Sequence, residues 1–474
     1  MYDESFFYFL LLNFLLNKMN IINPATEEVI ATVQVDSPTT LEEKYRRLLA
    51  AQQVWAQLPL GERINTLIRF AAFLEAESAS LAEILTAETG KPLQQAKNEI
   101  KGAISRINWL TANAERYLSD ELMQENGTVR ECISYEPLGV IGNISAWNYP
   151  YLVGVNVFVP ALIAGNGVLY KPSEYATLTG LEIDRLLKKA GVPDHVFQLA
   201  IGDGPVGKMM LDMELAGYFF TGSYHTGKYI YEQVSEKMVP CQLELGGKDP
   251  LYIANDISNI KAVAEATADG AFYNNGQSCC SVERIYVHQD IYDEYLDYFV
   301  QQVKAWTVGN PLDDDVYFGP LTRKLQINIL EAQVNDALAK GAKLLCGGKA
   351  IDGKGFYFEP TILVDVTHDM LIMKEESFGP IIGIMSVRSD EEALSLMQDT
   401  DYGLTAGIYT DSEARAVSLL KKIDAGSAYW NCCDRVSAAV PWSGRKHSGI
   451  GSTLSHQGLR AFTKPKAWHL VGSK

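Results

Sequence analysis

The sequence predicts an α/β protein with two lobes, and three observations support this fold class. Short apolar runs alternate with helix-compatible segments, this alternation occurs in two successive series, and a long helical segment precedes the first series. Alternating strands and helices are typical of βαβ units, in which helices cover both faces of a parallel sheet. A chain of 474 residues is also too long for a single core and suits two or three lobes.

The elements follow one another in a clear order. Apolar residues recur at helical spacing from Thr40 to about Ala114, and Gly90 is a suitable helix stop because glycine readily adopts the left-handed conformation. The expected strands of the first series are GVIGNISAW, GVLYKPS, HVFQLAI, GYFFTGS and PCQLELGG. The second series starts near Pro250 and contains SVERIYVH, AKLLCGG, PTILVDV, IIGIMSV, LTAGIYT and GSAYWN. The glycine pair Gly246-Gly247 places the boundary between the lobes near Leu245.

Composition and charge favour a small-molecule partner. The net charge is −17 without any basic block, which argues against binding to nucleic acid or to an anionic membrane surface. The seven cysteines are odd in number and lack CxxC spacing, which disfavours a disulfide framework and a zinc ribbon. The histidines are scattered and no carboxylate cluster accompanies them, so no metal site is expected. We expect a reducing, cytoplasmic compartment.

The segment 1–18 differs from the rest of the chain. Its residues 6–17 are strongly apolar, but Asp3 and Glu4 stand where a signal peptide has basic residues, and no A-x-A site follows. The apolar run is also shorter than the roughly 20 residues that a membrane span needs. We interpret this segment as a loose appendage or the product of an upstream start site.

The stretch GDGPVG, Gly202 to Gly207, matches the dinucleotide pattern G-x-G-x-x-G between a strand-like and a helix-like segment. No acidic residue ends a following strand about 20 positions later, as that fingerprint requires. We therefore interpret the stretch as a turn whose glycines permit the bend.

Four other stretches place polar or aromatic residues at expected strand ends or turns. Glu244 ends a strand before two glycines, Asn148 follows another, and Lys171 and Glu174 follow a third. Phe378 lies in the turn FGP after an acidic stretch. Each residue has a structural explanation when taken alone: an ion pair between Glu244 and Lys248, a turn cap, a solvated lysine and a core phenylalanine.

Taken together with YNNGQSCCSV at residues 273–282, these stretches resemble the aldehyde dehydrogenase superfamily. The resemblance extends from about residue 19 to the end and includes INPATEE near the start and PWSGRKHSGIG near the close. In this family the nucleophile lies two places after the glutamine of the GQxC pattern. The resemblance therefore implies Cys279 as the nucleophile and a packing role for Cys280.

The resemblance also implies the other roles. Asn148 is the side-chain half of an oxyanion hole, the Cys279 backbone N–H is the other half, and Glu244 is the general base. The implied cofactor residues are Lys171, Glu174, Gly222, Ser223, Glu376, Phe378 and Trp147. Because the Glu174 carboxylate would bind a free ribose 2′-hydroxyl and repel a 2′-phosphate, NAD is expected rather than NADP. The implied substrate pocket contains Tyr149, Tyr151, Leu152, Arg435 and Trp442.

Arg435 is the charged member of this pocket, and two interpretations of it stay open. Its guanidinium could hold the far carboxylate of a semialdehyde, or it could pair with Asp434 or a surface acid. The aromatic lining would equally admit an aryl, medium-chain or quaternary-ammonium aldehyde.

The resemblance implies a doubly wound Rossmann-like cofactor domain (19–117 and 138–243), a catalytic α/β domain (244–445) and a small β bridging element (118–137 and 446–474). The bridging element would add strands to a neighbouring subunit, so a homodimer or homotetramer is expected. The expected reaction is NAD-dependent oxidation of an aldehyde to the acid through a cysteine thioester. The alternatives are acyl transfer to coenzyme A, which would not need Glu244, and a non-catalytic binding or structural role.

Two departures from the family pattern are visible. Ser452-Thr453 replaces the Arg-Glu pair that follows the C-terminal glycine motif in many relatives, and Tyr224-His225 follows FTGS. The first departure is expected to alter how the C-terminal tail is held, and the second to alter the packing beneath the cofactor diphosphate.

Overall fold

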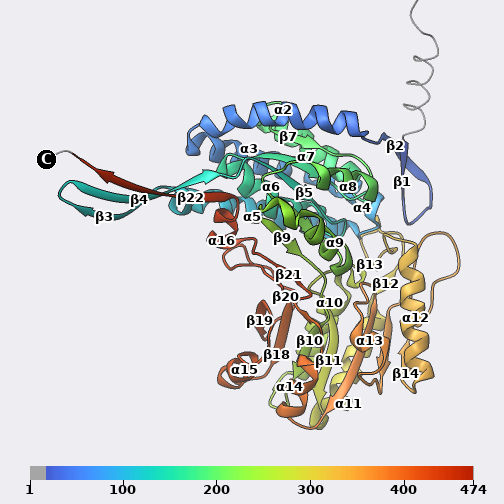
Figure 1. Cartoon of the computed structure of the whole chain (residues 1–474). Helices are drawn as coiled ribbons and strands as arrows, with labels where there is room; N and C mark the ends of the chain where they lie inside the picture. The colour runs from blue at the N-terminus through green and yellow to red at the C-terminus, as the bar shows by residue number, and fades with distance from the viewer. Residues whose placement is uncertain (1–17, 473–474) are drawn as a thin grey trace, which may run out of the picture.

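The computed structural model describes residues 18–472, and its two lobes and a projecting three-stranded arm are visible in Figure 1. The interpretation of segment 1–18 therefore lies outside the described residues, apart from Lys18. The described chain begins with an antiparallel pair, β1 (Lys18–Ile22) and β2 (Val29–Gln34).

The predicted helical segment forms a layer of four helices over the first lobe (Figure 1). Ser37 caps the first helix by accepting a hydrogen bond from the Thr40 N–H, in a capping box. Gly90 ends the third helix at φ 78°, and a Cβ there would lie 2.6 Å from the Pro320 ring, so only glycine fits. The four helices are α2 (Pro38–Gln57), α3 (Leu60–Ala76), α4 (Ser78–Thr89) and α5 (Leu93–Leu118).

The first sheet has six strands in the order β21-β9-β8-β5-β6-β7, and all its pairs are parallel except β21 with β9. These strands are β5 (Val140–Ile144), β6 (Gly167–Lys171), β7 (Phe197–Leu199), β8 (Tyr218–Thr221), β9 (Cys241–Glu244) and β21 (Gly449–Ile450). Their connecting helices are α6 (Pro150–Ala164), α7 (Thr177–Ala190), α8 (Gly204–Asp212) and α9 (Tyr224–Val234). The five strands expected from the first series are thus present, and a short segment from the C-terminal tail joins them.

The second sheet has seven strands in the order β14-β15-β16-β11-β10-β18-β19, parallel except for β14 with β15. The strands are β10 (Asp249–Ile253), β11 (Val282–His288), β14 (Lys343–Cys346), β15 (Thr361–Val364), β16 (Ile381–Val387), β18 (Thr405–Tyr409) and β19 (Ser427–Trp430). The helices are α10 (Ile260–Phe272), α11 (Tyr292–Ala305), α12 (Leu325–Ala339), α13 (Leu371–Lys374), α14 (Asp390–Gln398) and α15 (Glu413–Leu420). Short pairs complete the lobe: β12 (Thr307–Val308) with β13 (Val316–Phe318), and β17 (Tyr402–Gly403) with β20 (Arg445–Lys446).

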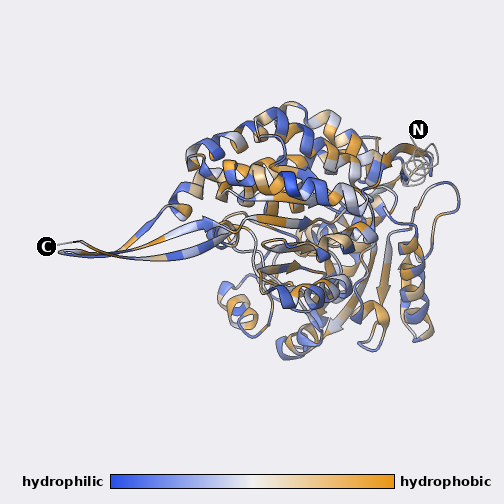
Figure 2. Cartoon of the chain, turned by 45° about the horizontal axis from the view of Figure 1, so that its top comes forward, coloured by the Kyte–Doolittle hydropathy of each residue, from blue (hydrophilic) through white to orange (hydrophobic). Residues whose placement is uncertain are grey.

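The arm is a three-stranded antiparallel sheet of β3 (Glu121–Asn126), β4 (Val129–Pro137) and β22 (Thr463–Val471), the last preceded by α16 (Ser455–Arg460). It extends away from both lobes (Figure 1). The interior strands are coloured mainly as apolar, whereas the outer helices alternate apolar and polar residues along their length (Figure 2). Among residues 18–472, no helix combines the length and apolar character needed to cross a membrane.

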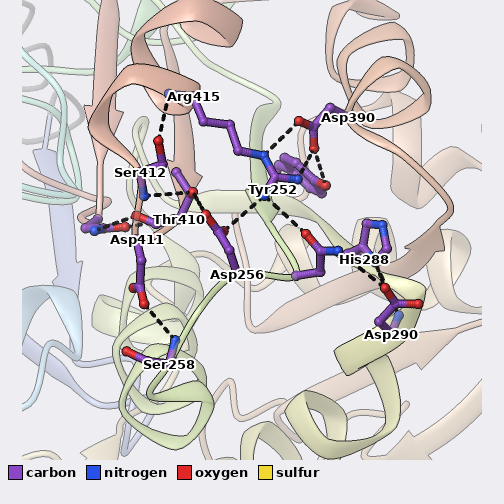
Figure 3. Close-up of polar contacts among 12 residues, drawn as sticks. Tyr252, Asp256, Ser258, His288, Asp290, Asp390, Thr410, Asp411, Ser412 and Arg415 are labelled. Atoms are coloured by element: carbon purple, nitrogen blue, oxygen red, sulfur yellow. Dashed lines mark hydrogen bonds and ion pairs between the residues drawn. The ribbon is translucent and has the colours of Figure 1, made fainter.

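A polar cluster joins two helices to the carboxyl edge of the second sheet (Figure 3). The Arg415 guanidinium donates to Asp390 and forms an ion pair with Asp256 at 3.1 Å, while the Tyr252 hydroxyl donates to Asp390 at 2.8 Å. Thr410 donates to the second oxygen of Asp256. Each of these charged groups has a partner of opposite charge or a hydroxyl donor, so the cluster fixes helices α14 and α15 on the sheet.

Candidate active site

A cleft of about 1090 Å³ lies between the lobes and brings together residues from distant segments. It forms where four parallel strands of the first sheet end, which is where ligands bind in doubly wound folds. All ten residues predicted for catalysis and cofactor binding line it: Trp147, Asn148, Lys171, Glu174, Gly222, Ser223, Glu244, Cys279, Glu376 and Phe378. No group of His, Cys, Asp and Glu side chains in residues 18–472 could hold a metal ion.

The two adjacent cysteines occupy different environments. Cys279 is half-buried and lines the cleft, whereas Cys280 is only 5% exposed and donates a hydrogen bond to Asp434 Oδ1 at 3.0 Å. A hydrogen bond with the Cys279 thiol, burial and the nearby Asp434 carboxyl raise the pKa of Cys280 well above its ordinary value. Because the thiolate is the nucleophilic form, this environment makes Cys280 unreactive and leaves Cys279 as the candidate nucleophile.

The loop before Cys279 has an unusual backbone. Asn274 and Asn275 both adopt left-handed angles, at φ 55° and 57°, a conformation that asparagine tolerates better than most residues. The Asn274 side-chain amide donates to the carbonyl oxygens of Asn148 and Gln277, at 3.2 and 3.1 Å. The Asn148 amide donates to the same Gln277 carbonyl at 3.1 Å. The loop is thereby joined to the turn that carries Asn148.

A buried ion pair holds the other side of that turn. Lys91 and Glu99 pair at 1% and 0% side-chain exposure, and the Lys91 ammonium donates to the Asn148 carbonyl at 2.7 Å. Glu99 accepts from the Tyr151 N–H at 2.9 Å, in the first turn of α6, which has no side-chain cap of its own. An anion at a helix N-terminus is also favoured electrostatically. The pair therefore fixes the backbone on both sides of Tyr149 and with it the Asn148 amide.

Glu244 is buried at the end of β9 and has two donors on one oxygen. Its Oε1 accepts from the Thr453 hydroxyl at 3.1 Å and from the Gln242 amide at 3.5 Å, while Oε2 has no partner among the described residues. Burial raises the pKa of Glu244 to about 8, and the Thr453 hydrogen bond partly opposes this rise. A carboxylate with a pKa near neutrality and one free oxygen is well suited to take a proton from water.

Replacing Thr453 with valine is expected to move the pH dependence of turnover. The Thr453 hydroxyl stabilises the Glu244 carboxylate, so its removal raises the pKa of that group further, and a base with a higher pKa becomes active at higher pH. We expect the ascending limb of the kcat–pH profile to move up by about one pH unit, since a hydrogen bond to a charged group contributes roughly 1.5–3 kcal/mol. Ser452→Ala is the matched control because the Ser452 hydroxyl reaches only the Thr453 carbonyl. A superimposable profile for Thr453→Val would show that Thr453 does not tune the base.

One part of the cleft carries a cation and an anion. The Lys171 ammonium lies 3.9 Å from a Glu174 carboxylate oxygen, and burial lowers the pKa of Lys171. Ser223 also lines the cleft and caps helix α9, because its hydroxyl accepts from the Thr226 N–H at 3.4 Å. A helix N-terminus in the same cleft as a lysine and a glutamate would suit the diphosphate and ribose of a dinucleotide.

Another part of the cleft is partly aromatic. The rings of Trp147 and Phe378 meet edge to face with centroids 5.5 Å apart, next to Asn148. Glu376 accepts from the Gly247 N–H at 3.0 Å, and burial raises the pKa of Glu376 to about 8. A Cβ at Gly247 would lie 2.7 Å from the Cys279 carbonyl oxygen, so glycine is needed where these segments meet. This part of the cleft would receive a planar ring such as nicotinamide.

Sequence reasoning missed several residues of the site. Gly204, Pro205 and Gly207 line the cleft, although the stretch GDGPVG had been interpreted as a simple turn, and the pattern match itself was the available signal. The sequence offered no comparable signal for Lys91 and Glu99, because both lie in a segment that reads only as helical.

The residues predicted for the substrate pocket do not line this cleft. Tyr149, just before α6, and Leu152, in its first turn, are both half-buried. Tyr151 is fully buried in the helical core of the first lobe. Trp442 is 7% exposed and packs in a small cluster with Cys280. Arg435 is exposed and forms no ion pair with a described residue, Asp434 included.

Comparisons with known proteins agree with this arrangement. Residues 15–468 match the model of the aldehyde dehydrogenase family. The chain is 34% identical to betaine aldehyde dehydrogenase of Brucella anthropi over 465 residues, covering 96% of this chain and 94% of that protein. It is 32% identical to the NADP(+) succinate-semialdehyde dehydrogenase of Mycobacterium avium over 460 residues, covering 96% and 97%.

Among solved structures, PnpE in complex with nicotinamide adenine dinucleotide is similar, with a TM-score of 0.93 and 29% identity over 96% of this chain and 95% of that one. The predicted α/β fold class is thus confirmed, as is the predicted enzyme class. This chain therefore belongs to the aldehyde dehydrogenase family and is an NAD(P)-dependent oxidoreductase of aldehydes, as its sequence over nearly the whole length, its fold and its cleft residues agree.

Proposed function

We propose that this enzyme oxidises its aldehyde to the carboxylic acid through a thioester on Cys279, that Glu244 activates the hydrolytic water, and that NAD is the preferred acceptor. One observation carries the proposal. Cys279, Asn148 and Glu244 come from three distant segments and line the same cleft as the residues suited to a dinucleotide.

The first step is addition of the Cys279 thiolate to the aldehyde carbon. This addition makes the carbon tetrahedral and places a negative charge on the former carbonyl oxygen. The Asn148 amide and the Cys279 backbone N–H are the donors we assign to this oxyanion, and removal of one such donor typically costs about 100- to 1,000-fold in rate. The Asn148 amide has two N–H donors, and since one donates to the Gln277 carbonyl, the other is left for the oxyanion.

A bound nicotinamide supplies the acceptor for the hydride that leaves this carbon. Trp147, Phe378 and Glu376, which line the cleft, would orient its ring. The hydride loss leaves an acyl group on the Cys279 sulfur. Glu244 then takes a proton from water at its free oxygen Oε2, the hydroxide attacks the acyl carbon, and the Cys279 sulfur leaves as thiolate.

The presence of Glu244 disfavours the coenzyme A alternative, because transfer of the acyl group to a thiol would not require a base for water. A panel of aldehydes, assayed for reduced nicotinamide with and without coenzyme A, tests the proposal. We expect turnover and carboxylic acid without coenzyme A. Turnover that depends on coenzyme A would contradict the hydrolytic route, and no turnover with any aldehyde would contradict the proposed function.

The preference for NAD rests on Glu174. Its carboxylate would accept hydrogen bonds from a free ribose and repel a 2′-phosphate, although the adjacent Lys171 weakens that repulsion. We expect Glu174→Gln to lower the ratio of kcat/KM for NAD to that for NADP by about 10-fold or more, in line with the loss of one charged hydrogen bond. Glu182→Gln on the surface of α7 is the control, because Glu182 pairs only with Arg185. A wild-type enzyme that uses both cofactors equally well would contradict this assignment.

We further propose that the enzyme works in the cytoplasm as a homodimer or homotetramer. The arm supports this assembly, because β22 and β3 are exposed edge strands that carry large apolar side chains. These are Leu122, Met123, Trp468, Leu470 and Val471. A single species of one-chain mass by light scattering at micromolar concentration would contradict it.

A further inference from the structure

Arg106 is a buried cation without a counter-charge. It lies on α5 and is 9% exposed. Its Nη1 donates to the Leu152 carbonyl at 3.1 Å and to Asn156 Oδ1 at 2.9 Å, and both acceptors are neutral. Among the described residues, no carboxylate pairs with this guanidinium, and its Nε and Nη2 have no hydrogen-bond acceptor.

The other buried cations are satisfied in a different way. Lys91 pairs with Glu99, and Lys248 pairs with Glu283. Arg284, which is fully buried, uses all three of its nitrogens to donate to carbonyl oxygens and a tyrosine hydroxyl. A buried charge that lacks such compensation is costly, so Arg106 has unused capacity to bind an anion.

Arg106 is bonded to the helix that follows Asn148 and does not line the cleft proposed for the cofactor. Its Nη1 bonds tie it to the first two turns of helix α6, at Leu152 and Asn156, and this helix begins just after Tyr149, the residue that follows Asn148. Burial lowers the pKa of Arg106 to about 10, and the Cys280 and Cys279 thiols are the first of the groups that oppose this shift. The guanidinium is therefore charged at neutral pH and close to the nucleophile.

The chemistry of the reaction sets the direction of the substrate tail. The hydride must leave toward the cofactor cleft, which Arg106, Tyr149 and Leu152 do not line. An aldehyde bound to the Cys279 sulfur must therefore extend its tail away from that cleft. Tyr149 and Leu152 are half-buried and lie outside that cleft, and Arg106 donates to the Leu152 carbonyl.

We propose that Arg106 binds the distal carboxylate of the substrate, and that the preferred substrate is a semialdehyde with a carboxylate at the end opposite its aldehyde. The free Nε and Nη2 form the edge of the guanidinium that carboxylates bind with two parallel hydrogen bonds. This inference rests on the proposed aldehyde oxidation and adds the substrate class to it.

The charged groups nearby are compatible with this assignment. Glu99, about two turns earlier on α5, is already paired with Lys91. Asp434 accepts from Ser278 and Cys280, and burial raises its pKa to about 7, so it carries only part of a negative charge at neutral pH. A cation at Arg106 would also disfavour a quaternary-ammonium aldehyde of the kind named for the Brucella anthropi relative.

The test compares two aldehydes of equal chain length, succinic semialdehyde and butanal, in the wild type and in Arg106→Met, Arg106→Lys and Arg116→Met. Methionine keeps much of the apolar stem of Arg106, and lysine keeps its charge but not the two parallel N–H donors of the guanidinium. Arg116 is a control cation near the end of the same helix. For Arg106→Met we expect kcat/KM for succinic semialdehyde to fall about 100-fold through KM, with butanal changed less than about 3-fold. Arg106→Lys should recover part of the loss, and Arg116→Met should match the wild type.

The outcomes separate the inference from the proposed function. Equal losses for both aldehydes in Arg106→Met and Arg106→Lys would mean that Arg106 only holds α5 against α6, and would overturn the inference. An unchanged preference in both variants would overturn it as well. If Arg106→Met does not fold, Arg106→Lys alone decides. An undiminished preference for succinic semialdehyde over butanal in that variant contradicts bidentate binding, and a reduced preference supports bidentate binding. A wild type that oxidises neither aldehyde nor any other would contradict the proposed function itself.

Discussion

Replacing Cys279 with alanine is expected to lower kcat/KM for every aldehyde by about 10,000-fold or more. Without a thiolate the aldehyde carbon stays trigonal, and no hydride can leave from it, so removal of the nucleophile removes the chemical step itself. The adjacent Cys280 cannot substitute, because it is buried against Asp434 with a pKa held well above its ordinary value. The measurement is steady-state formation of reduced nicotinamide together with the circular dichroism spectrum of the variant.

Cys280→Ala provides the matched control for this experiment. Because its side chain packs in a small apolar cluster with Leu404, Trp442 and Leu454, we expect a modest loss of stability and turnover within about 5-fold of the wild type. Near-normal turnover in Cys279→Ala, or a collapse of turnover in Cys280→Ala with a native spectrum, would reassign the nucleophile.

Replacing Glu244 with glutamine is expected to stop the reaction halfway. The acyl group still forms on Cys279, because addition and hydride loss do not require the carboxylate, but water is no longer activated. Rapid mixing should therefore show a burst of one reduced nicotinamide per active site, followed by turnover about 100- to 10,000-fold slower than in the wild type. A mass increase of the protein by the acyl group would identify the trapped species.

Glutamine keeps the size of Glu244 and can still accept from Thr453, so the fold should be unaffected. Adding a small thiol gives a further check, since it can accept the acyl group without a base and should restore turnover. Absence of both the burst and the acyl adduct would place Glu244 in the first half of the reaction instead of the second.

The order of elements was predictable because it depends on local pattern. Buried parallel strands such as Gly167–Lys171 are continuous apolar runs, and the amphipathic helices around them have the spacing of three and four residues, so both are visible without tertiary information. Strand ends that carry polar residues were visible for the same reason, which is why Glu244, Lys171 and Asn148 stood out. The boundaries of the three domains stay a prediction.

The remaining features of the site depend on contacts that a linear pattern does not contain. Lys91 and Arg106 lie on neighbouring segments of one helical layer, yet Lys91 is neutralised by Glu99 and Arg106 forms no ion pair with a carboxylate among the described residues. This difference follows from how α5 packs on α6. Likewise, Thr453 was noted only as a departure near the end of the chain, and its contact with Glu244 arises because β21 pairs with β9.

The pairing of β21 with β9 also has a consequence for how the enzyme is made. The Thr453 to Glu244 hydrogen bond spans 209 positions, so the base receives its partner from a segment that the ribosome adds much later. Domains generally fold as units during synthesis, starting with the N-terminal one. A nascent chain that includes Cys279 but not residues 449–453 has Glu244 without its Thr453 donor, so the pKa of that carboxyl stays higher until the C-terminal segment pairs with β9. Completion of translation thus finishes the electrostatic environment of a carboxyl group that was synthesised long before it.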